Sequence, residues 1–210
     1  MKPAIYDAMR SRRSVRRFKP DAVPHDVITS LIEAAITAPS ASNKQPWRFL
    51  VVEDRVRITR MAAAVRHATD VVASHIPDQN HEAFRAYGDY FTRFENAPAV
   101  IVPIHRAMSV LTNLVDDDVE AGLRTTIRRM EEQSGLVGTS LALMNLLLMA
   151  HALGLGASGM TGPLVAEPAL REILEVPEGW GIVAVVPIGW PAEDPVPTDR
   201  KPVDKVIRWL

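Results

Sequence analysis

The feature that most restricts the fold of this 210-residue chain is a long apolar stretch over residues 136–153. It reads as a helix that is apolar on nearly every side, with Asn145 and His151 within it. Such a helix must be enclosed, so other parts of the chain or a second copy must cover it. The most apolar run of the chain, residues 141–156, overlaps it and is shorter than the roughly 20 residues of a membrane span. We therefore expect a buried helix and no membrane anchor.

Composition favours one well-packed domain, because 47% of the residues are hydrophobic and single cores commonly reach this size. The formal net charge of −1 argues against a nucleic-acid partner. The absence of cysteine excludes thiol nucleophiles, disulfides and thiolate ligands, and the scattered histidines lack the spacing of a metal site. Lys2, Asp7 and Arg10 interrupt the N-terminal apolar residues, unlike a secretory signal. We expect a cytoplasmic protein without a metal.

Hydrophobic periodicity predicts alternating helices and strands along the whole chain. We expect helices over residues 3–11, from Pro24 to Pro39, two between Asp54 and Phe94, and one over 168–175. Residues 119–133 and 136–153 predict two further helices, which leaves residues 134–135 between them. Strands are predicted over residues 47–52, 99–104 and 181–188, of which the second is continuously apolar and hence central.

Two short polar segments carry the chemical signal. In the arginine segment, residues 12–18, an extended backbone places Arg12, Ser14 and Arg16 on one side. Two guanidinium groups with a hydroxyl between them suit a phosphate monoester, although such a stretch alone is more typical of a solvated surface. In the amide segment, residues 38–47, Pro39 ends a helix before a run of hydroxyl and amide side chains. Those groups suit a sugar-alcohol chain or a ring edge.

At these two segments the chain resembles the nitroreductase family, flavoproteins that hold FMN between the subunits of a homodimer. Further matching blocks follow in the same order, at residues 96–102, 152–157, 160–162 and 200–203. The resemblance implies an α+β, three-layer sandwich, a mostly antiparallel sheet wrapped by helices, in an intertwined homodimer. It implies a single domain over residues 1–210, whose proline-rich C-terminal arm, about 190–210, wraps the partner subunit.

The resemblance also implies which residues bind FMN. Arg12 and Ser14 match the ligands of the phosphate and ribityl chain, Arg16 matches a cation beside the pyrimidine edge, and Arg13 is a further contact. A cation there stabilises the anionic reduced flavin. In the amide segment, the implied contacts across the dimer interface are Pro39, Ser40, Ala41, Ser42 and Asn43. Gln45 matches a position that often accompanies them, and the alternative is that it bonds only to local backbone.

Two later blocks complete the implied site. The backbone of Met160, Thr161 and Gly162 passes the reactive N5 edge of the flavin, where little side-chain bulk fits. Arg200 is our preferred further phosphate ligand, with Lys201 as the alternative one position on. Residues 154–159 also read Gly-x-Gly-x-x-Gly, but a helix precedes them where a dinucleotide-binding fold has a strand. We interpret these glycines as the end of that helix.

The implied function is a ping-pong oxidoreductase. NADH or NADPH passes a hydride to the flavin, which then reduces a nitroaromatic, a quinone or another electron-poor small molecule. The chemistry is borne by the flavin, so no side chain is predicted to be catalytic. The alternatives are other flavin chemistry on this fold, such as dehydrogenation or dehalogenation, and an FMN-binding protein without turnover. Residues 76–114, which lie near the substrate in such enzymes, match no known substrate class.

Overall fold

The computed structural model describes residues 4–210, so residue 3 of the predicted first helix and residues 1–3 of the predicted domain lie outside the described residues. The helices are α1 (Ala4–Ser11), α2 (His25–Ile36), α3 (Arg55–Ala73), α4 (His81–Gly88), α5 (Ala121–Ala152) and α6 (Glu167–Ile173). The strands are β1 (Trp47–Val52), β2 (Ala99–Arg106), β3 (Gly156–Ala157), β4 (Trp180–Ile182) and β5 (Val186–Gly189). The α+β class is confirmed.

The strands form one antiparallel sheet in the order β1-β2-β5-β3, with β4 also paired to β2. Ile101 of β2 lies in register with Val51 on one side and Val186 on the other. The continuously apolar β2 is therefore central, as its sequence predicts, because both of its faces are covered.

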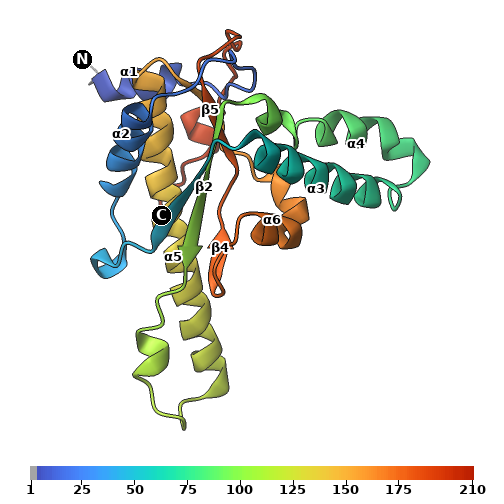
Figure 1. Cartoon of the computed structure of the whole chain (residues 1–210). Coiled ribbons are helices and arrows are strands. Elements are labelled where there is room, and N and C mark those ends of the chain that lie inside the picture. The colour runs from blue at the N-terminus through green and yellow to red at the C-terminus, as the bar shows by residue number, and fades with distance from the viewer. Residues whose placement is uncertain (1–3) are drawn as a thin grey trace.

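Helices cover both faces of this sheet and give the predicted three layers (Figure 1). On β2, Val100 and Val102 belong to a core shared with α3 and α6, whereas Ile101 belongs to a second core shared with α2 and α5. This alternation is the period of two that a strand imposes on its side chains. Trp47, the last residue of the amide segment, is 8% exposed and belongs to the second core.

The prediction of two helices over residues 119–153 is wrong, because α5 is one continuous helix of 32 residues. Gly135 resembles a helix break in the sequence, yet its missing side chain serves packing. A Cβ there would collide with the carbonyl oxygen of Arg106 on β2. The glycine lets the long helix cross the sheet at close range.

Helix α5 ends at the glycines that the sequence predicted as its end. Gly154 has φ of 76°, its N–H donates to His151 O at 3.1 Å, and Leu155 N–H donates to Ala150 O at 2.8 Å. These two bonds form the Schellman motif that closes a helix. The short strand β3 follows directly, and no sequence pattern predicted it.

The prediction of one strand over residues 181–188 is also wrong, because β4 and β5 are separate. Between them, Val183 N–H donates to Pro103 O at 2.9 Å. Val185 exchanges two backbone hydrogen bonds with Met160, at 2.9 and 3.0 Å. Between β4 and β5 the chain thus departs from β2, and Val185 pairs with Met160 instead. Periodicity alone does not reveal this change of partner.

Within residues 4–210, α5 is the one helix whose length and composition would suffice to cross a membrane, by those two criteria alone. It packs against α2 and β2 as a core helix. Its remaining apolar side chains are exposed in the single chain, among them Val137 (57%), Leu141 (44%) and Met144 (38%).

Candidate functional site

The arginine segment is fixed at the edge of the sheet. Ser14 forms a parallel bridge with Ala157 of β3, and Val15 N–H donates to Ala157 O at 3.1 Å. The backbone N–H groups of Arg16 and Arg17 donate to the carboxylate of Glu193, at 2.6 and 3.1 Å. The backbone of the segment is therefore held from two sides, and its side chains are oriented by the sheet.

Three cationic side chains lie near one another in this region: Arg12, Arg13 and Arg200. Arg200 is nearly 190 residues away from the other two in sequence. Nε of Arg12 and Nε of Arg13 are buried, and within the described residues neither has a hydrogen-bond partner. Burial, followed by the charges of Arg200 and Arg13, lowers the pKa of Arg12 from its usual value. Buried donors without a partner are costly, and this cluster suits an anion with several oxygen atoms.

A cavity of about 600 Å³ adjoins the cluster, between α1 and the C-terminal tail. Arg13 and Arg200 line it, and Lys201 is not among its lining residues. Two donors here already have local partners: Arg13 donates to Arg10 O at 2.6 Å, and Arg200 donates to Thr198 Oγ1 at 2.7 Å. The geometry thus favours Arg200 over Lys201, and both remain predictions as ligands.

Met160, Thr161 and Gly162 lie one step further along the same edge. Met160 is 7% exposed and pairs with Val185 through its backbone. A Cβ on Gly162 would collide with the ring of Phe91, so this position leaves no room for a side chain. The buried Oγ of Ser158, at 1% residue exposure, also lacks a partner within the described residues.

Two aromatic residues that the sequence did not assign connect these parts. The Arg16 guanidinium lies 5.5 Å from the centroid of the Tyr90 ring, and Arg93 lies 4.0 Å from it. Phe91, adjacent in sequence, packs against Gly162. Residues 90–91 therefore link the arginine segment to Met160–Gly162. Their aromatic type was the available signal, but their place depends on the tertiary fold.

The amide segment lies elsewhere, at the far end of α2 and against α5. Residues 41–45 are exposed, while Pro46 and Trp47 are buried. Ser42, Asn43 and Gln45 have left-handed φ values of 50°, 52° and 48°. Each is a strained conformation for a residue with a side chain, and such strain gathers at functional sites. Ser40 Oγ accepts a hydrogen bond from Gln45 N–H at 2.9 Å, which closes the turn.

The structure brings together the predicted residues at 12–16, at 160–162 and Arg200, but not those at 39–45. Figure 1 shows the light-blue turn of η1 (Ala41–Asn43) at the opposite end of α2 from the dark-blue arginine segment. The amide segment contacts Gly138 of α5 instead, through Ser40 and Pro46. Within a single chain, the two polar segments thus lie at opposite ends of α2.

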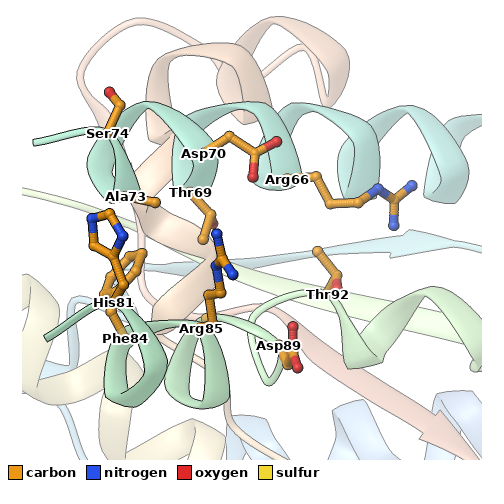
Figure 2. A pocket seen from close by; sticks show the side chains of 11 residues that line it. Arg66, Thr69, Asp70, Ala73, Ser74, His81, Phe84, Arg85, Asp89 and Thr92 are labelled. Atoms are coloured by element: carbon orange, nitrogen blue, oxygen red, sulfur yellow. The ribbon is translucent and has the colours of Figure 1, made fainter. Parts of the chain in front are cut away.

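Another cavity, of about 480 Å³, lies between α3 and α4 and contains none of the predicted residues. Figure 2 shows Arg85 rising from α4 toward Thr69 of α3. Arg66 at its edge donates to both oxygens of Glu95, at 2.7 and 3.2 Å, and this bonding raises the pKa of Arg66. Since its basic and acidic groups are interspersed, the cavity presents no concentrated charge.

Comparison with known proteins identifies the family of this chain. The profile of the nitroreductase family matches residues 9–190. The chain is 31% identical to an NADH dehydrogenase of Thermus thermophilus, covering 96% of this chain and 94% of that protein. It is 31% identical to an iodotyrosine deiodinase of Haliscomenobacter hydrossis, covering 95% and 85%. A nitroreductase with bound FMN from Desulfitobacterium hafniense shares the fold, with a TM-score of 0.74, 21% identity and full coverage of both chains. This chain belongs to the nitroreductase family.

Proposed function

We propose that the protein is an FMN-dependent oxidoreductase that takes a hydride from NADH or NADPH and reduces an electron-poor small molecule, such as a nitroaromatic compound or a quinone. The observation that carries the proposal is the gathering of Arg12, Arg13 and Arg200, in which the buried Nε atoms of Arg12 and Arg13 have no partner within the described residues. The phosphate of FMN would supply oxygen acceptors for those donors. The FMN-bound relative from Desulfitobacterium hafniense supports the choice of this anion.

Each part of the site would then have a distinct task. Arg12 and Arg200 would hold the phosphate, with Arg13 beside them, and the Ser14 hydroxyl would bond to the ribityl chain. Arg16, kept in place by stacking on Tyr90, would place its charge near the pyrimidine edge. Gly162 would allow its backbone to lie close to the flavin ring. A side chain at this position has no room, because the Phe91 ring occupies the space that it would need. When bound, the flavin supplies the hydride chemistry, and the protein supplies orientation and charge.

We further propose that the working form is a homodimer in which Pro39, Ser40, Ala41, Ser42 and Asn43 contact the cofactor of the partner subunit. The separation of this segment from the arginine segment within one chain supports the proposal. The apolar face of α5 lies beside it, with Val137 and Leu141 next to Ser40 in one cavity. The C-terminal arm is exposed, with Trp209 at 86%, and would gain cover by wrapping the partner.

Dehalogenation is a second candidate activity, favoured by the likeness to an iodotyrosine deiodinase. It would use the same FMN site with a different acceptor, so it changes none of the assignments above. We place either activity in the cytoplasm, where reduced nicotinamides are supplied.

The first experiment is a visible spectrum of the purified protein, followed by anaerobic addition of NADH and NADPH separately. We expect a flavin band at about 450 nm that one or both donors bleach, and recovery of the band when a nitroaromatic compound or a quinone is added. Absence of FMN after incubation with an excess of it would contradict the proposal. An FMN-loaded protein that neither donor bleaches would instead indicate a binding protein or other flavin chemistry.

A further inference from the structure

A cavity of about 610 Å³ extends from the amide segment to α5, and we call it the rim cavity. Ala41 and Ser42 of the predicted cofactor segment form one wall. The opposite wall comes from the loop after β2 and from α5, and is mainly apolar, with Met108, Val110, Leu111 and Met130. The rim cavity thus joins a predicted cofactor contact to an apolar chamber large enough for a small ring compound.

The loop wall of the rim cavity depends on Glu131, a 5%-exposed carboxylate of α5. Oε1 accepts hydrogen bonds from Val110 N–H and Leu111 N–H, both at 2.6 Å. Oε2 accepts from Thr112 Oγ1 at 2.6 Å and from Thr112 N–H at 3.3 Å. One side chain therefore fixes three consecutive residues of the loop, including the first residues of η4 (Leu111–Asn113).

These hydrogen bonds keep Glu131 ionised. Burial favours the neutral acid, but the bonds from Thr112, Leu111 and Val110 outweigh it and lower the pKa of Glu131. Both carboxylate oxygens of Glu131 accept hydrogen bonds from the loop, so its charge is already satisfied within the protein. Its effect on a ligand is therefore through the shape of the loop wall.

Lys44 carries the other charge among the residues that line the rim cavity. It is exposed, and within the described residues it forms no ion pair. A ligand in this cavity therefore meets apolar walls and one ammonium group. That combination favours a ring compound with an anionic substituent over a cationic one.

We propose that the rim cavity binds the electron acceptor, that Lys44 selects aromatic acceptors bearing a carboxylate or similar anionic group, and that Glu131 is a positioning residue that holds the loop wall. This inference rests on the proposed function, because it assigns the acceptor of that same flavin site. It adds the charge of the preferred acceptor, and it assigns roles to Lys44 and Glu131, which lie outside the predicted FMN contacts.

The test for Lys44 compares kcat/KM for 4-nitrobenzoate with kcat/KM for nitrobenzene, two acceptors that differ in one carboxylate. Lys44→Gln is expected to lower the ratio of the two values about fivefold, the size of a partly screened ion pair. Lys19→Gln removes an exposed charge outside the cavity and should leave the ratio unchanged. An unchanged ratio in Lys44→Gln would overturn the selectivity proposal.

The test for Glu131 uses Glu131→Gln, with Glu132→Gln as the exposed neighbour on the same helix. An amide cannot accept all the loop donors, so backbone exchange at residues 110–112 should accelerate about tenfold. We expect KM for both acceptors to rise about tenfold with kcat within twofold, and Glu132→Gln to match the wild type. Faster exchange of the loop without a change in KM would overturn the positioning role.

Calorimetric titration of the purified protein with 4-nitrobenzoate, without nicotinamide, separates this inference from the proposed function. Binding that weakens in Lys44→Gln supports the rim cavity even if neither donor bleaches the protein, a result that would contradict only the proposed function. Equal binding to the wild type and Lys44→Gln, in a protein that the donors do bleach, would overturn this inference alone.

Discussion

The arginine segment and the amide segment are both short and polar, yet the fold holds them in opposite ways. The arginine segment is bonded to the sheet through Val15 and to Glu193, and two of its buried guanidinium nitrogen atoms lack a partner within the described residues. The amide segment is an exposed turn with three left-handed residues and one closing bond from Gln45 to Ser40. One segment is fixed and holds two buried donors without a partner among the described residues, whereas the other is strained and directed outward.

This difference favours a site made by two chains. A sheet edge can orient charged side chains for a phosphate within one subunit. A strained turn on the outside is useful only if something lies against it, because strain of this kind persists where the surroundings or function require it. The exposed apolar face of α5 beside the turn indicates where a second subunit would lie.

The largest expected effect comes from Arg12→Ala in the fixed half. Loss of one charge-assisted hydrogen bond to a phosphate costs about 2–3 kcal/mol, so the Kd for FMN should rise about a hundredfold. The melting temperature of the apoprotein should not fall, because the variant removes a guanidinium whose buried Nε has no partner within the described residues. Fluorescence titration with FMN measures the Kd. Arg17→Ala, an exposed neighbour, is the control, and equal losses in the two variants would argue against a specific phosphate ligand.

The next effect separates two neighbouring glycines in the middle of α5. Gly135→Ala drives a Cβ into the Arg106 carbonyl on the sheet side, whereas Gly138→Ala meets only ordinary contacts with Ser40 and Pro46 on the turn side. We expect Gly135→Ala to lose about 2 kcal/mol of unfolding free energy. Gly138→Ala should instead gain up to about 1 kcal/mol from helix propensity. Denaturant unfolding of the apoprotein measures both, and similar results for the pair would contradict the close approach at Gly135.

A smaller effect is expected from Ser40→Ala in the strained half. Its hydroxyl accepts the bond that closes the turn, so its loss should cost about 1 kcal/mol and weaken FMN binding about fivefold. Titration of the purified protein with FMN measures this change. Ser30→Ala on α2 should have no effect on the titration, because its hydroxyl bonds only within that helix.

The smallest expected effect is a pH dependence of stability that comes from His105 on β2. His105 Nδ1 is buried without a partner within the described residues, and burial lowers the pKa of His105 despite the opposing charge of Glu167. The unfolded chain then binds a proton that the folded chain resists, so stability falls as pH drops below about 6.5. Melting between about pH 7 and pH 5 should show this slope. His105→Gln should flatten it and His67→Gln should not.

Periodicity predicted most of the helices and strands, and side-chain chemistry marked the two polar segments, because both are local properties. The three layers of the fold followed from the family resemblance. Periodicity did not predict the continuous α5, since Gly135 reads as a break until Arg106 is placed against it. Glu131 was also missed. Its role depends on a loop about 20 residues upstream in sequence, and a glutamate in a polar helix carries no local sign of burial.

The most direct test of the composite site is a heterodimer of two damaged chains. One chain carries Arg12→Ala, and the other carries Ser42→Gly and Asn43→Gly, which remove side chains but permit left-handed φ. The two chains are coexpressed with different tags and the mixed dimer is purified. If each site uses the arginine segment of one chain and the amide segment of its partner, one site is intact, and the heterodimer binds one FMN tightly while both parent homodimers bind weakly. If both segments serve the site of their own chain, each site carries one defect, and a heterodimer that binds FMN no more tightly than its parents would contradict the account.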